Sequence, residues 1–351
     1  METTLTYQYR IKDTTIKNVL IGMSSQVNFV WNFTCDVIKK SWSESRKYVD
    51  LNLLSSLTKG SSKELDINSQ TIQASYEEVV KNTKRFKKQI RKRSRRTKLG
   101  WIPFKGQTFK FLGNYSTYNG YKIRYWYHRQ LPKDAIVKSG SFSEDSLGRW
   151  YLNLVVSFPE YLESSFENDG IGIDLGIKTN VALSNGEKLE RENISKNYEV
   201  KLAKAQRHRK KRQVKKINAK IKNKRKDWNH KISFELSKKF KYVFVGDTTP
   251  TSILSEFNKI NRAIYDASWF TFKTYLAYKV VRRQGCYLEV SEKDISSTET
   301  CSNCFNRYTD MSLGIREWTC GKCNSIHDRD INAARNHLRF GHETLRLANA
   351  S

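Results

Sequence analysis

The stretch Ile-Gly-Ile-Asp-Leu at residues 171–175 has the pattern of a short buried strand that ends in a carboxylate. Similar apolar stretches occur at residues 242–245 and 286–290. A long amphipathic helical pattern at residues 257–284 separates these last two stretches. Strands that alternate with helices predict an α/β layer, and we place this domain at residues 166–351.

The chain is strongly basic, and its charge is concentrated in two segments. Its 351 residues include 64 Lys and Arg against 35 Asp and Glu, which gives a net charge of +29. Residues 81–98 contain eleven basic residues and no acid, and residues 196–241 contain nineteen basic and three acidic residues. Each segment predicts a helix with a narrow apolar stripe and a broad cationic face. A solvated surface helix is the alternative, but the near absence of acids favours binding to a nucleic acid.

The N-terminal half has a different pattern. Aromatic and β-branched residues alternate with turn signals over residues 101–158, and residues 4–12 are also strand-like. We predict a small β-barrel at residues 1–165, interrupted by a basic helical insert at about residues 20–100. The polar stretch at 161–169 is expected to be a linker.

Four of the six cysteines form two Cys-x-x-Cys pairs separated by fifteen residues. These residues are Cys301, Cys304, Cys320 and Cys323. Two such pairs predict one tetrahedral, structural zinc ion with no open position for water. Reactive or disulfide-bonded pairs are the alternative, which would require an oxidising compartment. Cys35 and Cys286 lie in apolar stretches and are expected to be buried.

Three aspartates stand at the ends of predicted elements. Asp174 and Asp247 each end an apolar strand, and Asp330 stands at the start of a helix. Each one alone is as well explained by a turn or a helix cap. Together they match the carboxylates, converging from several elements, that metal-assisted phosphodiester hydrolysis requires. Mg²⁺ is the expected ion, because it prefers carboxylate and water oxygens.

The sequence predicts no association with a membrane. The mean hydropathy is −0.69, and no apolar run approaches the roughly 18 residues of a membrane span. The first six residues lack a basic flank followed by an apolar stretch. A cytoplasmic, nucleoid-associated protein is expected.

Five motifs in the C-terminal half resemble those of the TnpB family, which are transposon-encoded RNA-guided DNA nucleases. These motifs are Gly-Ile-Asp-Leu-Gly at 172–176, Asp-Ala-Ser-Trp at 266–269, Thr-Cys-Ser-x-Cys at 300–304, Arg-Glu-Trp-Thr-Cys-x-x-Cys at 316–323 and His-Asp-Arg-Asp-x-Asn-Ala-Ala-Arg-Asn at 327–336. The resemblance extends over residues 170–340. It is limited in the N-terminal half to composition and short pieces.

The resemblance implies an α+β multidomain protein. The N-terminal region would be a wedge-type barrel with a helical recognition insert. The C-terminal region would be a RuvC domain of ribonuclease H-like fold, with a zinc ribbon at 298–326. Such a protein binds a guide RNA derived from the transposon end, recognises a short motif beside a double-stranded DNA target, and cuts the DNA with Mg²⁺.

Asp174 and Asp330 fall on the first and last catalytic residues of the family, but the second motif departs from it. Many members have Glu after the strand at 242–245, whereas this chain has Gly246 followed by Asp247. Either Asp247 or another acid would then complete the site. Glu317 is the favoured substitute because it lies beside the zinc ribbon, and Glu289 and Glu292 are further candidates.

Two other functions compete with an active nuclease. The chain could be a nuclease-inactive, RNA-guided DNA-binding repressor, for which loss of Asp174 or Asp330 would be the expected sign. It could instead be a transposase or transposase accessory protein, which the ribonuclease H-like fold permits. Both outer aspartates are retained, and the basic helices fit guide and target binding, so the nuclease is favoured.

Overall fold

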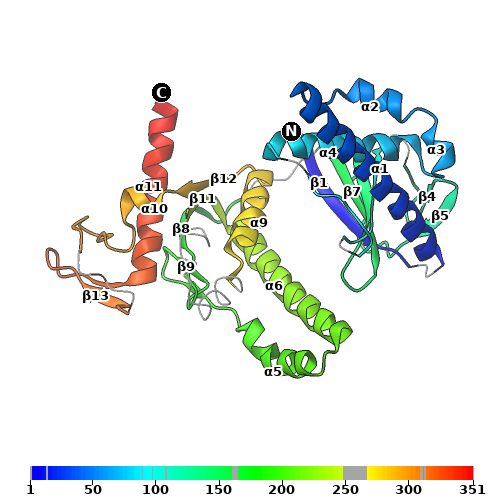
Figure 1. The fold of residues 1–351 in the computed structure, drawn as a ribbon. Coiled ribbons are helices and arrows are strands. Elements are labelled where there is room, and N and C mark those ends of the chain that lie inside the picture. The colour runs from blue at the N-terminus through cyan, green and yellow to red at the C-terminus, as the bar shows by residue number, and fades with distance from the viewer. Residues whose placement is uncertain are drawn as a thin grey trace. The chain divides into compact units, whose positions relative to one another are not determined.

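The computed structural model describes residues 2–12, 15–88, 90–96, 98–106, 109–159, 165–247, 267–308, 311 and 314–350. The chain divides into two compact units, Met1–Tyr161 and Leu162–Ser351, and Figure 1 shows their elements. Part of the predicted linker, the first part of the predicted helix at 257–284, and Asp266 lie outside the described residues.

The first unit contains two antiparallel sheets. The larger has the order β1 (Glu2–Arg10), β7 (Trp150–Pro159), β6 (Ile136–Glu144), β2 (Trp101–Lys105). The smaller has the order β3 (Lys110–Phe111), β4 (Tyr115–Tyr118), β5 (Tyr121–Arg124). A single bridge between Ile11 and Tyr125 links their edges, and the rings of Phe104, Phe142 and Tyr118 pack together between them.

The predicted small β-barrel is not closed in the strands that the structure describes. These strands form two open sheets, with β1 and β2 at the edges of the larger one. The reason lies in the turns: Gly113 and Gly120 have positive φ and close short strands that pair with one another. Strands of two to four residues are too short to complete the larger sheet.

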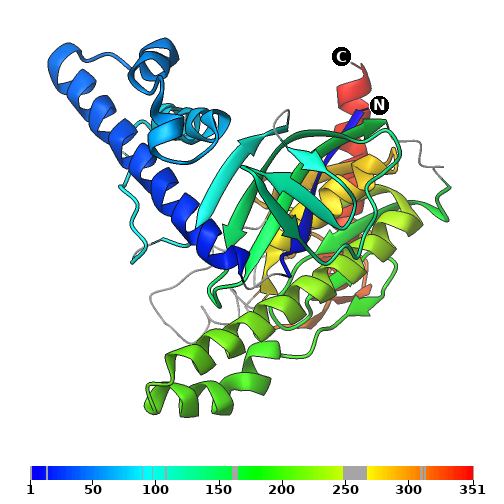
Figure 2. The ribbon, with the colours of Figure 1, turned by 90° about the vertical axis from the view of Figure 1, so that its right-hand side faces the viewer.

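Four helices lie between β1 and β2. They are α1 (Ile16–Ser45), α2 (Leu51–Leu57), α3 (Ser61–Glu64) and α4 (Ser69–Phe86). Helix α1 buries one stripe that includes Leu20, Val27 and Val30, and it packs against α4. The long blue helix in Figure 2 is α1, with α4 beside it.

The first basic segment is helical over only part of its length. Helix α4 ends at Phe86, where Lys87 adopts a left-handed conformation with φ of 49°. Residues 90–96 then run beside α1 without forming a helix. The side chain of Asn32 donates to the carbonyl of Arg93 at 2.9 Å and accepts from its backbone N–H at 2.7 Å. These bonds satisfy backbone groups of a segment whose dense like charge opposes helix formation, so the predicted helix over 81–98 is wrong for the described residues after Phe86.

The second unit is built on a five-stranded mixed sheet. Its order is β10 (Lys188–Leu189), β9 (Val181–Leu183), β8 (Asn168–Asp174), β11 (Phe240–Gly246), β12 (Cys286–Val290). Strands β8, β11 and β12 are parallel, whereas β9 is antiparallel to β8. The carboxyl ends of the three parallel strands therefore meet at one edge of the sheet, where ligands bind in open α/β folds.

Helices cover both faces of this sheet. Val243 and Val245 point to the face covered by α6 (Lys211–Lys239) and α9 (Trp269–Arg282), whereas Phe244 points to α11 (Arg329–Ala350). Helix α11 lies so close to β8 that a Cβ on Gly172 would overlap the carbonyl of Ala334. This approach brings residues of α11 to the edge where β8 ends.

The second basic segment forms a helical hairpin. Helix α5 (Ile194–Arg207) packs against the first part of α6, and Figure 2 shows the pair in light green. Their contact is a small core of Ile194, Ala205, Ile217 and Ile221. Most of the lysines and arginines of the hairpin are therefore exposed.

A second small hairpin lies before α11. Strands β13 (Glu317–Thr319) and β14 (Ile326–Asp328) pair antiparallel, with Trp318 opposite His327. Across the described ranges, no helix is both long and apolar enough to cross a membrane.

Candidate functional site

Three side chains converge where β8 ends. Asp174 is the last residue of β8, Glu292 begins α10 (Glu292–Ile295), and His337 lies on α11. The potential ligand atoms of these three residues all lie within 4.8 Å of one another. The group could hold a metal ion.

His337 is fully buried and bonded through both ring nitrogens. Nδ1 lies 2.9 Å from the carbonyl oxygen of Ile173, and Nε2 lies 2.5 Å from Glu292 Oε1. Both partners are acceptors, so the protonated ring satisfies both. Burial by itself would lower the pKa of His337, but the hydrogen bond and charge of Glu292 raise it.

Asp174 has a strongly perturbed acidity. Burial raises its pKa to about 7; His337 opposes this rise, and the carboxylates of Glu292 and Asp330 add to it. Asp330 is the second residue of α11, and its Oδ1 lies 3.4 Å from the guanidinium of Arg316. A carboxylate whose charge is opposed by its neighbours is typical of a site that binds a cation.

The other predicted acids have different surroundings. Asp247 Oδ1 accepts a hydrogen bond from the backbone N–H of Glu292 at 3.0 Å. Glu317 is exposed on β13 and pairs in register with Asp328. Glu289 bonds Lys273 at 2.9 Å. Of the considered substitutes for the missing glutamate, Glu292 is the one that the structure brings to Asp174.

Sequence reasoning missed His337. The signal was its position seven residues after Asp330, about two helical turns, which places both residues on the same face of α11.

The four cysteines of the two Cys-x-x-Cys pairs also come together. Their Sγ atoms lie within 4.8 Å of one another, with Cys301 and Cys323 3.7 Å apart and Cys304 and Cys320 3.5 Å apart. Tetrahedral zinc with Zn–S bonds of about 2.3 Å requires sulfur separations of about 3.8 Å. The cluster therefore fits zinc.

Two asparagines join the start of the cysteine region to α11. The side-chain amides of Asn332 and Asn336 each donate to the carbonyls of Ser297 and Thr300, at distances between 2.6 and 3.2 Å. Asn332 also accepts from the backbone N–H of Ser302 at 2.9 Å. The cysteine cluster is thus anchored to the helix that carries Asp330 and His337.

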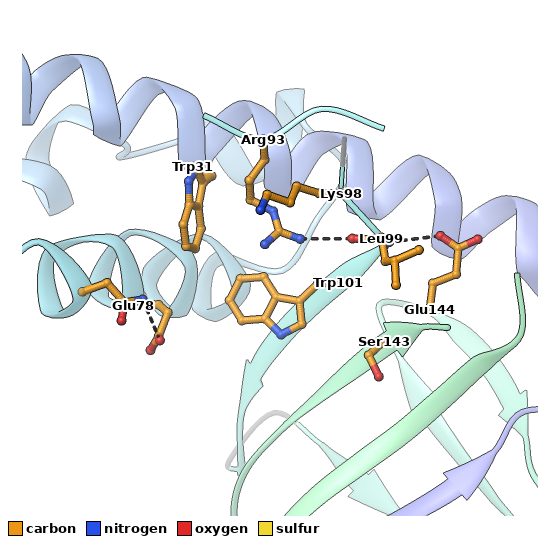
Figure 3. A pocket seen from close by; sticks show the side chains of 10 residues that line it. Trp31, Glu78, Arg93, Lys98, Leu99, Trp101, Ser143 and Glu144 are labelled. Carbon is orange, nitrogen blue, oxygen red and sulfur yellow. Dashed lines mark hydrogen bonds between the residues drawn. The ribbon is translucent and has the colours of Figure 1, made fainter. Parts of the chain in front are cut away.

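The first unit has an open pocket of about 570 Å³ where the non-helical basic segment meets β2 (Figure 3). The guanidinium of Arg93 packs against two indoles that meet edge to face, 5.1 Å from the ring centre of Trp31 and 5.4 Å from that of Trp101. Glu78 and Asn82 of α4 line the opposite side and bond each other at 2.9 Å. Aromatic, cationic and amide groups in one pocket are suited to a nucleobase and its phosphate.

The chain is similar to several known proteins. A family model described as Cas12f1-like, TNB domain matches residues 269–337, from the start of α9 to His337. A protein of Streptomyces pristinaespiralis named "Putative RNA-guided DNA endonuclease" is 35% identical over 225 residues, which is 61% of this chain and 55% of that protein. TnpB-like protein L79 of Acanthamoeba polyphaga mimivirus is 30% identical over 138 residues, 37% of this chain and 25% of that protein.

The chain is similar to TnpB-like proteins and to proteins named as putative RNA-guided DNA endonucleases. It spans about half the length of the Streptomyces relative and a quarter of the viral one. Its fold resembles that in the cryo-EM structure of a Cas12f1–sgRNA–target DNA complex, with a TM-score of 0.60 and 13% sequence identity. That match covers 92% of this chain and 82% of the Cas12f1 chain, and it establishes a multidomain α+β fold.

Proposed function

We propose that this protein is a transposon-associated, RNA-guided DNA endonuclease that hydrolyses target phosphodiesters by Mg²⁺-dependent RuvC chemistry. The observation that carries the proposal is the convergence of Asp174 and Glu292 at the carboxyl edge of the parallel strands, with Asp330 close enough to affect the acidity of Asp174. The relatives named as RNA-guided DNA endonucleases support it.

Asp174, Glu292 and Asp330 would hold the magnesium, since all three offer the hard oxygen ligands that it prefers. Bound there, magnesium supplies an activated water and stabilises the leaving oxygen of the phosphodiester. Asp247 would hold Glu292 in place through its backbone, which gives it a supporting role in the site. Glu317 lies on the β13–β14 hairpin beside the cysteine cluster, and it would not bind the magnesium.

The four cysteines would hold a structural zinc ion. All four positions are thiolates, so no coordination site remains for a reacting water. The anchoring of this region to α11 supports a role in keeping Asp330 and His337 in position.

The partners would be a guide RNA from the transposon end and a double-stranded DNA target with a short adjacent motif. The cationic surface of the α5–α6 hairpin supports phosphate binding. In this arrangement residues 1–165 would be the wedge domain with its helical recognition insert. Residues 166–351 would be the nuclease domain.

A nuclease-inactive repressor is the second candidate, because β11 ends in Gly246 followed by Asp247, which departs from the second motif of the family. The approach of Glu292 to Asp174 argues against it, since an acid from α10 restores a carboxylate at this edge.

The test is a cleavage assay on the complete chain copurified with its RNA. Reprogrammed to a plasmid target, the wild type should cut in Mg²⁺, Asp174→Ala and Glu292→Gln should not, and Glu317→Ala should cut normally. RNA-dependent target binding without cleavage by the wild type would identify a repressor. If Glu317→Ala lost cleavage and Glu292→Gln stayed active, the third metal-binding carboxylate would be Glu317 on the β13–β14 hairpin.

A further inference from the structure

Gly246, the last residue of β11, stands at the centre of the acidic site without a side chain. A Cβ at this position would overlap Glu292 Oε1 and would lie 2.8 Å from Cε1 of His337. The carboxylate of Glu292 and the ring of His337 therefore occupy the space into which a side chain at 246 would project. The φ of Gly246 lies outside the left-handed region, so the backbone conformation does not require glycine here. The neighbouring side chains of Glu292 and His337 require it.

We propose that His337 is a positioning residue, which holds the Glu292 carboxylate beside Asp174 in the space that Gly246 leaves open. The inference rests on the proposed function, because it gives Glu292 the role of a metal ligand. It adds that α11 contributes a second residue to the site besides Asp330, and that Gly246, Glu292 and His337 work only as a set.

The contacts of His337 are those of a fixed support. Its Nδ1 bond to the carbonyl of Ile173 orients the ring from the strand that carries Asp174, and its Nε2 bond fixes one oxygen of Glu292. The side chain has no exposed surface, so the ring has no room to turn away. The hydroxyl of Ser297 donates to the other oxygen of Glu292. Ligand carboxylates that are held by hydrogen bonds in this way depend on them for metal affinity.

Glu292 needs this support because of its location. It begins a helix of four residues, which offers little rigidity of its own. Its backbone is held by Asp247, but its side chain must extend over Gly246 to reach Asp174. Without His337, the carboxylate could rotate away from Asp174.

Three substitutions at position 337 separate positioning from packing. In His337→Gln the amide nitrogen can take the place of Nε2 and still donate to Glu292. In His337→Asn the amide nitrogen takes the place of Nδ1, so the bond to Ile173 is kept and the bond to Glu292 is removed. His337→Leu fills similar volume and makes neither bond.

Each variant is prepared as the full chain with its guide RNA and assayed for plasmid cleavage over a range of Mg²⁺ concentrations. We expect His337→Leu and His337→Asn to cut about 10- to 100-fold more slowly and to require more Mg²⁺, whereas His337→Gln should remain within about fivefold of the wild type. Target binding should be unchanged in all three. Mn²⁺ titration followed by electron paramagnetic resonance reads ion binding in the same samples, independently of cleavage.

A second variant tests the space at Gly246. Gly246→Ala should displace the Glu292 carboxylate and slow cleavage about as much as His337→Leu, because the added Cβ would overlap Glu292 Oε1. Gly22→Ala, where a Cβ meets nothing within 4 Å, is the matched control.

The outcomes distinguish this inference from the proposed function. A wild type that does not cut would overturn the function, and Mn²⁺ binding would still test the positioning. A cutting wild type with an equally active His337→Leu would overturn the inference alone. Better activity in His337→Asn than in His337→Gln would also overturn it, because the bond to Ile173 would then be the one that matters.

Discussion

The carboxylate of Asp247 accepts a hydrogen bond from the backbone N–H of Glu292, with Oδ1 and N 3.0 Å apart. The acid at the end of β11 thus fixes the first residue of α10. We expect Asp247→Asn to keep most of the cleavage activity, because the amide oxygen still accepts this bond. Asp247→Ala should cut about tenfold more slowly, measured in the plasmid assay. An Asp247→Asn variant as inactive as Asp174→Ala would show instead that Asp247 binds the metal.

Removal of one zinc ligand should unfold the cysteine region. Cys320→Ser should yield protein with less than stoichiometric zinc by elemental analysis. It should also unfold at a lower temperature, since a structural zinc site supplies folding free energy. Cys286→Ser is the matched control, because Cys286 lies on β12 outside the cluster. Full zinc content in Cys320→Ser would contradict the four-cysteine site.

The guanidinium of Arg93 should contribute strongly to the stability of the first unit. It packs against the indoles of Trp31 and Trp101, its Nε donates to Asn28 at 3.0 Å, and burial lowers its pKa. Arg93→Met should lower the free energy of unfolding by about 2 kcal/mol in denaturant titrations. Arg96→Met, at an exposed position of the same segment, should have little effect. Equal decreases in the two variants would exclude a specific role for the stacking.

The contact between α6 and α9 should make stability depend on pH. Burial and the charges of Lys279 and Lys226 lower the pKa of His230 to about 4 from an ordinary value of 6.5. Between these values the unfolded chain binds more protons at this residue. The stability that neutral His230 gives is therefore complete above pH 6.5 and is lost as the pH falls toward 4.

His230→Phe isolates this effect, because it retains a ring to stack on Tyr275, whose centre lies 3.9 Å from that of His230. Between pH 6.5 and 4, the free energy of unfolding should fall by about 1–2 kcal/mol more in the wild type than in the variant. Parallel curves in urea titrations across this range would contradict the assignment.

The exposed lysines of the α5–α6 hairpin should determine the salt dependence of RNA binding. Replacing Lys215, Lys216 and Lys222 with Gln should weaken binding. It should also reduce the slope of log Kd against log salt by about one for each RNA phosphate that the variant no longer neutralises. Gln213→Ala with Asn218→Ala on the same helix is the neutral control. An unchanged slope would place the RNA on another surface.

The sequence was most informative where one residue type dictates the geometry. Two Cys-x-x-Cys pairs require a common centre, and the cysteines do meet. Apolar stretches ending in Asp174 and Asp247 identified the edge of the sheet. Glu292 and His337 could not be ranked from sequence, because their approach depends on the space at Gly246 and on how closely α11 packs against β8.

The errors have physical causes as well. The basic stretch after Phe86 has the spacing of a helix, yet the Asn32 side chain provides hydrogen bonds to a non-helical segment there. Alternating residues at 101–158 predict strands correctly, but alternation does not fix how many strands share a sheet. Turn geometry at Gly113 and Gly120 decided that point.

The position of α11 in the sequence has a consequence for synthesis on the ribosome. Asp174 emerges early, but Asp330 and His337 follow only after the cysteine region has been translated. Until then, the face of the sheet around Phe244 has no covering helix, and the acidic edge lacks two of its side chains. With the proposed function, a nascent chain would therefore be unable to cut DNA, and its exposed sheet face would be open to aggregation or chaperone binding until α11 has emerged from the ribosome.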